Sequence, residues 1–210
     1  MTLNKILSSG LILGIFGLAG AGLVATIETL TKDRREANII AARLRNLHEV
    51  VTPSLHDNNI LEDTIHIKDP AFSSKYPTIV YRARKNGKPV AAVFETTAPE
   101  GYAGPIRMLI GIDMKGTITG VRVLEHRETP GLGDGIEADR SDWIFHFAGH
   151  SIGNPPLPRW AVKKDGGVFD QFTGATITPR LVVNTIRKTL LYFNTHKHSV
   201  FIGGDSPHEQ

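Results

Sequence analysis

The sequence predicts an α+β fold, in which one N-terminal membrane-spanning helix precedes an antiparallel sheet with helices packed on it. Three observations carry this prediction. The 22 positions from Ile6 to Ile27 contain no charged residue. Between Thr78 and Val123, short stretches of alternating apolar and polar residues are separated by tight-turn residues, as in consecutive strands. After Pro179, apolar residues recur every three or four positions, as in an amphipathic helix.

Composition limits the function classes. The 210 residues suit one domain of ordinary size with an appendage. The net charge of +3 is mild and spread along the chain, which argues against a nucleic-acid-binding surface. There is no cysteine, so disulfides, ordinary iron–sulfur ligation and covalent c-type haem are excluded. A redox role would need another cofactor.

The uncharged N-terminal run is long enough to cross a hydrocarbon core, which needs about 20 helical residues. A secretory signal peptide is the alternative, with Lys5 as the positive region and Ala19-Gly20-Ala21 as a small-residue cleavage site. The apolar run continues past that site to Ile27, which favours an uncleaved anchor. Both interpretations export the rest of the chain.

The charges that flank this span favour a cytoplasmic location for the rest of the chain, which is opposite to export. One basic residue, Lys5, precedes the span, and more basic residues follow it. By the positive-inside rule, this bias would leave the large C-terminal part in the cytoplasm. The basic residues that follow are Lys32, Arg34, Arg35, Arg43 and Arg45.

Helical spacing continues from Leu30 to Val50, and Pro53 ends it. A hairpin is predicted over 78–97, with Asn86-Gly87 as its tight turn. Two further strands are expected at 106–114 and 117–123, joined at Lys115-Gly116. The sheet is therefore expected to be antiparallel.

The final helix is predicted from Pro179 to about Thr195, with Thr178 as its N-cap. Ahead of it, Gly174 and Ala175 keep bulky side chains away, and Thr176 offers a hydroxyl near the positive end of the helix dipole. Such a junction is either a capped turn or an anion site. Physical reasoning leaves both open.

The motif Asp170-x-x-Thr173-Gly174-Ala175-Thr176 resembles the acceptor motif of proteins that carry FMN on a phosphoester to the last threonine. The chain resembles the G-subunit family of the Rnf/Rsx electron transport complex, and is similar to the C-subunit family of sodium-translocating NADH:quinone reductase. The resemblance implies that Thr176 is flavinylated. An Arg180 side chain near the phosphodiester would add to the field of the helix dipole.

The stretch Glu128-Thr129-Pro130-Gly131-Leu132-Gly133 contains a predicted type II turn, in which Gly131 takes a positive φ. It is also similar to a signature of the same FMN-binding family. The resemblance therefore implies that this loop lies beside the flavin. The expected flavin-binding residues are Thr176 as covalent acceptor, Thr173, Gly174, Ala175, Thr178, Glu128, Thr129 and Leu132. The glycine spacing departs from Gly-x-Gly-x-x-Gly, which excludes a Rossmann dinucleotide site.

A metal site can be imagined at His146 with His150 or at His196 with His198. Gly149 weakens the helix that would align the first pair, and no metal is expected. Trp160 is expected to pack over either the core or the flavin. The expected division is a transmembrane anchor (1–28), a membrane-proximal helix (29–55), the first part of the soluble domain (56–100), the FMN-binding domain (101–196) and a tail (197–210).

The resemblance implies an electron-carrying flavoprotein that serves in a complex coupling redox chemistry to ion translocation, with no catalysis of its own. Its expected partners are the membrane proteins of that complex, the membrane itself and a flavin transferase. Its expected place is the bacterial inner membrane, with the soluble domain in the periplasm, against the charge bias. The alternatives are the C-type component of the quinone reductase, a membrane-anchored sensory module, and an exported structural domain without flavin.

Overall fold

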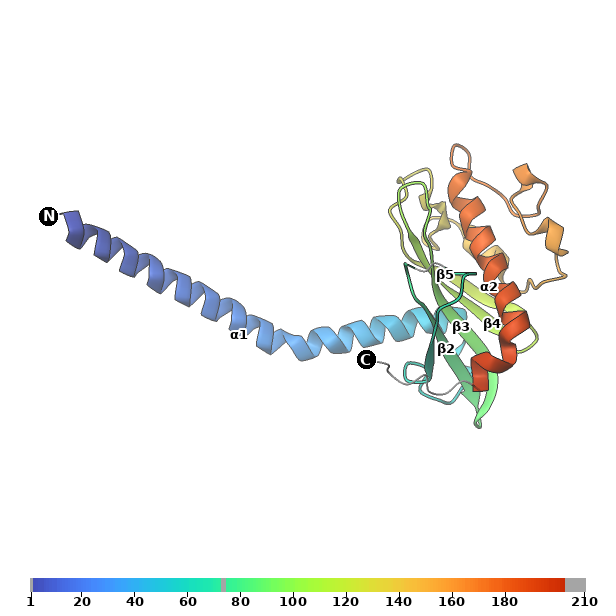
Figure 1. Cartoon of the computed structure of the whole chain (residues 1–210), viewed down its shortest axis with the longest axis horizontal. Coiled ribbons are helices and arrows are strands. Elements are labelled where there is room, and N and C mark those ends of the chain that lie inside the picture. The colour runs from blue at the N-terminus through green and yellow to red at the C-terminus, as the bar shows by residue number, and fades with distance from the viewer. Residues whose placement is uncertain (1, 73–74, 203–210) are drawn as a thin grey trace. The chain divides into compact units, whose positions relative to one another are not determined.

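The computed structural model describes residues 2–72 and 75–202 (Figure 1). By the contacts that the chain makes with itself, residues up to 44 form one unit and residues from 45 onward a second. Helix α1 (Thr2–Val50) runs through the first unit and ends in the second. Its N-terminal part is long and apolar enough to cross a membrane. The anchor and the membrane-proximal segment are therefore one helix as far as Val50, followed by a 3₁₀ turn at Pro53–Leu55.

The sheet of the second unit has five antiparallel strands in the order β1-β2-β3-β4-β5. The predicted antiparallel fold is confirmed. Each strand pairs with the next along the chain, because the connections are short enough for neighbouring strands to meet. The strands are β1 (Thr64–Ile67), β2 (Thr78–Lys85), β3 (Lys88–Ala98), β4 (Ile106–Asp113) and β5 (Ile118–Glu125).

The predicted Asn86-Gly87 hairpin turn is confirmed, since both residues have positive φ, +51° and +73°, as a type I′ turn requires. The predicted strands 106–114 and 117–123 correspond to β4 and β5. Strand β1 was not predicted: it is four residues long and pairs only with β2 among the described strands. Short edge strands carry little hydrophobic alternation, so the sequence gives a weak signal for them.

Helix α2 (Ile177–Ile202) lies across one face of the sheet (Figure 1). Val182, Ile186 and Phe193 are fully buried, and the Phe193 ring meets Phe94 of β3 edge to face, with ring centroids 6.1 Å apart. This face of the sheet and α2 form the main core. The helix is longer than predicted at both ends, and buried Phe201 explains why it continues beyond Thr195.

The end of α1 packs against the opposite face of the sheet, where two glycines allow a close approach. Gly111 of β4 pairs across the sheet with Gly120 of β5. A Cβ on Gly111 would lie 2.8 Å from the carbonyl oxygen of Val50, and one on Gly120 would lie 3.0 Å from the Val50 Cα. The Thr119 hydroxyl donates to that same carbonyl at 2.6 Å. The sheet therefore receives the helix end at backbone contact.

Between β5 and α2 the chain has no regular strand and forms four 3₁₀ helices, Asp134–Ile136, Asp142–Phe147, Leu157–Arg159 and Lys163–Asp165. Aromatic side chains fix this region to the core. Trp160 is almost fully buried, and its indole N–H donates to the carbonyls of Ser151 and Pro155. Trp160 therefore packs in the core, which decides between the two roles expected for it.

Candidate functional site

The motif Asp170–Thr176 forms a tight turn that leads directly into α2. The amide of Ala175 donates to the carbonyl of Phe172 at 3.1 Å, and Gly174 takes φ +80° at the third position of the turn. Positive φ at that position requires glycine in a type II turn. The side chain of Phe172 holds the turn against the rest of the domain, because its ring packs edge to face on Trp143 with centroids 5.3 Å apart. The turn ends at Ala175, and Thr176 is the last residue before α2.

Thr176, rather than Thr178, takes the position of the N-cap. The carbonyl of Thr176 accepts the first helical hydrogen bond, from the amide of Arg180 at 3.2 Å, and α2 begins at Ile177. The prediction that Thr178 caps the helix is therefore wrong. Thr178 lies inside the first turn, where its hydroxyl is buried and donates to the carboxylate of Glu128.

The first turn of α2 leaves two backbone donors open. Within the described residues, no hydrogen bond is made by the amides of Ile177 or Thr178, and Pro179 has no amide hydrogen. Open amides at a helix N-terminus, next to the positive end of the dipole, suit an anion. The end of α2 therefore retains the anion-binding capacity that the sequence suggested.

Arg180 does not strengthen this field as expected. Its guanidinium forms two hydrogen bonds with the carboxylate of Asp165, at 2.6 and 2.8 Å. The hydrogen bond from Arg180 lowers the pKa of Asp165, and the same bond raises the pKa of Arg180. The charge of Arg180 is therefore offset by a neighbouring carboxylate, and the open amides supply most of the local attraction for an anion.

Loop 126–133 approaches α2 from the end of β5. The predicted turn at Pro130-Gly131 is confirmed, because Gly131 has φ +77° and the Leu132 amide donates to the Thr129 carbonyl at 3.1 Å. His126 holds the start of the loop: its Nδ1 accepts from the Glu128 amide at 3.0 Å, so its Nε2 carries the hydrogen that it donates to Glu137 at 2.6 Å.

Glu128 joins three segments that are distant in the sequence. Only 5% of the residue is exposed, and one carboxylate oxygen accepts from the Thr178 hydroxyl. The other oxygen accepts from the amide of Ala103 at 3.1 Å. Gly133 permits this packing, because a Cβ there would lie 2.8 Å from the Glu128 Cβ and 3.0 Å from the Thr178 hydroxyl. Glu128 therefore acts first as a clamp between the loops and α2.

These segments enclose a half-open pocket of about 200 Å³. All the predicted flavin-binding residues line it except Thr173, which is exposed in the turn. The sequence did not single out Tyr102, Gly133 or Ile177, which also line the pocket. The pocket is lined by Tyr102, Glu128, Thr129, Leu132, Gly133, Gly174, Ala175, Thr176, Ile177 and Thr178.

The rim of the pocket is apolar and exposed. Tyr102 is 70% exposed, Ile177 47% and Leu132 46%. Exposed apolar side chains grouped around a concave site commonly mark a binding surface. A flat ring system with an anionic tail would find apolar contacts at this rim and open amides at the start of α2.

Other candidate groups lie apart from this pocket. Among the described residues, no group of three or more His, Asp or Glu side chains is arranged to hold a metal ion. His196 stacks on Tyr192 with ring centroids 4.2 Å apart, and the ring of His150 packs near Phe169. Asp170 of the motif does not line the pocket and instead forms an exposed ion pair with Lys163 at 2.6 Å.

Comparison with known proteins decides the family. Residues 101–191 match the FMN-binding domain model, and residues 1–50 match the model of the RnfG N-terminal region. The chain is 48% identical over 186 residues to the G subunit of the ion-translocating oxidoreductase complex of Photorhabdus laumondii, which covers 89% of each chain. It is 47% identical over 193 residues to the corresponding protein of Erwinia tasmaniensis, which covers 92% of each chain. The chain belongs to the RnfG family.

The predicted resemblance is thus confirmed. Among solved structures, the chain is similar to NqrC of Shewanella oneidensis, with a TM-score of 0.44 and 22% identity, over 72% of this chain and 73% of that one. With the apolar helix α1, membership of a family of membrane complex components indicates a membrane-anchored flavoprotein.

Proposed function

We propose that this protein carries electrons on FMN esterified to Thr176, within a membrane complex that couples electron transfer to ion translocation. One observation carries the proposal: two motifs about 50 positions apart meet in one pocket around the Thr176 side chain. The match of residues 101–191 to an FMN-binding domain supports FMN as the ligand. The names of the relatives support the complex and its ion-translocating role.

The residues of the pocket fit this group. The volume of about 200 Å³ is below the roughly 300–1,000 Å³ of sites that enclose a whole drug-sized ligand, so part of the flavin would stay accessible. Tyr102, Leu132 and Ile177 offer apolar contact to the ring system. The open amides of Ile177 and Thr178 lie where the phosphodiester charge would sit. When bound, FMN supplies the electron-carrying chemistry, and partial exposure suits exchange with a partner.

Thr176 is the acceptor in this proposal. Its side chain is partly exposed at the pocket, so the hydroxyl is open to a transferase. In the attachment step the Thr176 oxygen forms a bond to the flavin phosphorus, and the phosphoanhydride bond of an activated flavin nucleotide breaks. The hydroxyl proton leaves with the released nucleotide. Asp170 and Thr173 are exposed beside the acceptor and are available for recognition by that flavin transferase.

The test is a Thr176→Val variant, expressed with a flavin transferase and separated on a denaturing gel under ultraviolet light. The wild-type band should fluoresce, and its Thr176 peptide should carry the mass of FMN. Thr176→Val should lose all covalent flavin yet remain folded, since valine keeps the branched shape. Thr195→Val is the matched control and should keep the flavin, because Thr195 is exposed on α2 and does not line the pocket. A fluorescent Thr176→Val band would overturn the acceptor assignment.

The alternatives differ in their partners. The C-type component of the quinone reductase is the weaker candidate, because the relatives at 47–48% identity are G-type components of the ion-translocating oxidoreductase complex. A sensory module would use the same domain without electron transfer. Purification of the tagged chain from its native membrane distinguishes these functions: the proposal predicts several multi-span redox proteins in the eluate, whereas a sensory module would come without them.

We further propose that α1 is an uncleaved anchor in the bacterial inner membrane, with the second unit in the periplasm. The chain has no cysteine, so a single introduced one reports location cleanly. Lys115 is exposed in the turn between β4 and β5, so a substitution there should leave the fold intact. Lys115→Cys should react with a membrane-impermeant maleimide on cells whose outer membrane alone is permeabilised. Labelling only after inner-membrane lysis would place the domain in the cytoplasm instead.

A further inference from the structure

The basic segment that follows the membrane span has no role in the flavin site. Within it, a shallow groove of about 430 Å³ runs along one face of α1, lined by Thr31, Arg34, Arg35, Asn38, Ile39 and Ala42. We propose that Arg34 and Arg35 bind the phosphate groups of anionic phospholipids at the membrane surface. This proposal does not rest on the flavin.

The membrane-side end of the groove lies close to the headgroup layer. The uncharged run ends at Ile27, and Arg34 follows seven residues later, about 10 Å along a helix that rises about 1.5 Å per residue. The polar layer extends roughly 5–8 Å beyond the hydrocarbon core on each side. The Cα–Cβ bonds of a helix tilt toward its N-terminus, which here is the membrane side. Both arginine side chains therefore lean back toward the lipid phosphates.

The charges on the helix also favour an anion in this groove. Thr31, Arg34, Arg35 and Asn38 are separated by three, four or seven positions, apart from the adjacent arginines, so they share one face. The neighbouring acidic residues Asp33 and Glu36 do not line it. In the part of the chain that the structure describes, neither Arg34 nor Arg35 forms an ion pair, and both are exposed. The groove therefore carries two guanidinium groups that form no ion pair with a carboxylate among the described residues.

The chemistry of these side chains selects phosphate. Guanidinium groups donate paired hydrogen bonds to phosphate oxygens, and their apolar stems can lie along the hydrocarbon edge while the charge stays in the polar layer. The flanking apolar residue Ile39, 51% exposed, completes an amphipathic surface. This use of the basic residues holds on either side of the membrane, so the charge bias after the span does not by itself decide orientation.

The experiment measures lipid selectivity of the full chain in bilayers of phosphatidylcholine. A trace of spin-labelled phosphatidylglycerol is added, and the fraction of label immobilised by the protein is compared with that of spin-labelled phosphatidylcholine. The wild type should prefer phosphatidylglycerol. Arg34→Gln and Arg35→Gln should each reduce that preference by about fivefold, and the double variant by more. Raising the salt to about 1 M should weaken the preference of the wild type.

Arg43→Gln is the matched control, because Arg43 is exposed on the same helix but lies about 24 Å beyond Ile27, outside the headgroup layer. It should keep the wild-type preference. An equal loss in Arg43→Gln and Arg34→Gln would overturn the site, as would an unchanged preference in the double variant. Competition by inorganic phosphate beyond that of chloride at equal ionic strength would assign the groove to free phosphate instead.

A third outcome would also overturn the proposal. If the wild type shows no preference among lipids, while the Arg34→Gln, Arg35→Gln double variant no longer co-purifies with the other membrane proteins of the complex, the groove holds an acidic segment of a partner protein.

Discussion

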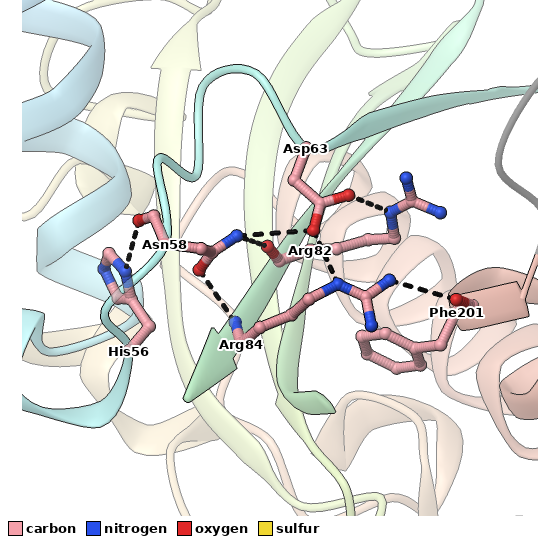
Figure 2. A network of polar contacts seen from close by, with 6 residues as sticks. All are labelled: His56, Asn58, Asp63, Arg82, Arg84 and Phe201. Atoms are coloured by element: carbon pink, nitrogen blue, oxygen red, sulfur yellow. Dashed lines mark hydrogen bonds and ion pairs between the residues drawn. The ribbon is translucent and has the colours of Figure 1, made fainter. Parts of the chain in front are cut away.

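The two ends of helix α2 differ in whether their terminal backbone groups have hydrogen-bond partners. At the C-terminal end, Arg84 of β2 donates from Nη2 to the carbonyl of Phe201 at 3.0 Å, and its guanidinium lies over the Phe201 ring (Figure 2). A cation placed there complements the negative end of the helix dipole. At the N-terminal end, the amides of Ile177 and Thr178 have no partner among the described residues. The C-terminal end is therefore satisfied within the fold, whereas the N-terminal end keeps two unpaired donors among the described residues.

The C-terminal end of α2, here called the closed end, is held by a hydrogen-bond network around Asp63. The N-terminal end is called the open end. Its two carboxylate oxygens accept from Arg82 Nε at 2.5 Å and from Arg84 Nε at 2.6 Å. Asn58 adds to this network, since its amide nitrogen donates to the Arg82 carbonyl at 2.9 Å and its oxygen accepts from the Arg84 amide at 2.8 Å (Figure 2). Segment 56–63, strand β2 and the last turn of α2 are thereby joined. By contrast, the open end is surrounded by turns with positive φ at Gly131 and Gly174.

The largest expected effect on stability comes from removing the carboxylate that holds the closed end. Asp63→Ala removes the carboxylate from two guanidinium groups whose side chains are only 10% and 22% exposed, and should destabilise the domain by about 3 kcal/mol. Thermal unfolding of the full chain in detergent measures this, because both tryptophans lie in the second unit. Covalent flavin should be unaffected in the folded fraction. Exposed Glu62→Ala is the control and should change stability by less than about 0.5 kcal/mol.

The next largest effect comes from removing the Glu128 contacts beside the open end. Glu128→Ala leaves the Thr178 hydroxyl and the Ala103 amide without their acceptor, at a cost of about 2 kcal/mol, and should lower the yield of covalent flavin. Glu128→Gln should recover most of the stability, since its amide oxygen still accepts from Ala103 and its nitrogen can donate to Thr178. Chemical denaturation and gel fluorescence give the two readouts. Equal stability of the alanine and glutamine variants would refute the role of Glu128 as a clamp.

A smaller effect distinguishes the role of the Gly174 turn in flavin attachment from the general cost of backbone strain. Gly174→Ala places a side chain at φ +80°, 3.3 Å from Leu132, and should cost about 1–2 kcal/mol and reduce flavin attachment. Gly166→Ala is a matched control, because Gly166 has φ +82° in a turn away from the pocket. Both variants should lose similar stability in thermal unfolding, and only Gly174→Ala should lose flavin. Loss of flavin in both would mean that strain alone, and not the site, controls attachment.

The smallest effect concerns the exposed pair between Asp165 and Arg180. The hydrogen bond from Arg180 lowers the pKa of Asp165 below 3.8, so the pair stabilises the fold above that pH and loses its contribution as pH falls through the lowered pKa. Asp165→Asn should therefore lower the unfolding temperature slightly at neutral pH and not at all in strong acid. A difference that persists in acid would show that the effect is not electrostatic. Flavin attachment should be unchanged.

Local patterns allowed much of the fold to be predicted. The Asn86-Gly87 turn and the alternating residues around it determine a hairpin without help from distant parts of the chain. Strand β1 could not be found this way, because it depends on pairing with β2 and on the contacts of Asp63. The approach of α1 to Gly111 and Gly120 also depends on residues about 60 or more positions apart, which no local pattern records.

The residues of the candidate site also fall into those that the sequence predicted and those that only the structure reveals. The resemblance supplied Thr176 and the loop at Glu128, and the structure brings them to one pocket. Tyr102 was not selected, because its segment meets the pocket through a contact of Ala103 with Glu128, 25 positions away in the sequence. The cap at Thr178 was wrong because a proline at the third helical position is as acceptable as one at the first, since neither amide has a helical partner. The buried contact that engages the Thr178 hydroxyl joins positions 50 apart, which no local pattern records.

The hydrogen bond between Thr178 and Glu128 also constrains how the two motifs can change over evolutionary time. A substitution that removes the polar group at one position alone, such as Glu128→Ala, leaves its buried partner unpaired and should be selected against. Apolar replacements of similar shape at both positions, such as Leu at 128 with Val at 178, would remove the hydroxyl together with its acceptor and leave only the Ala103 amide to be satisfied. Across the family, these two positions, 50 apart in the sequence, should therefore covary as a pair.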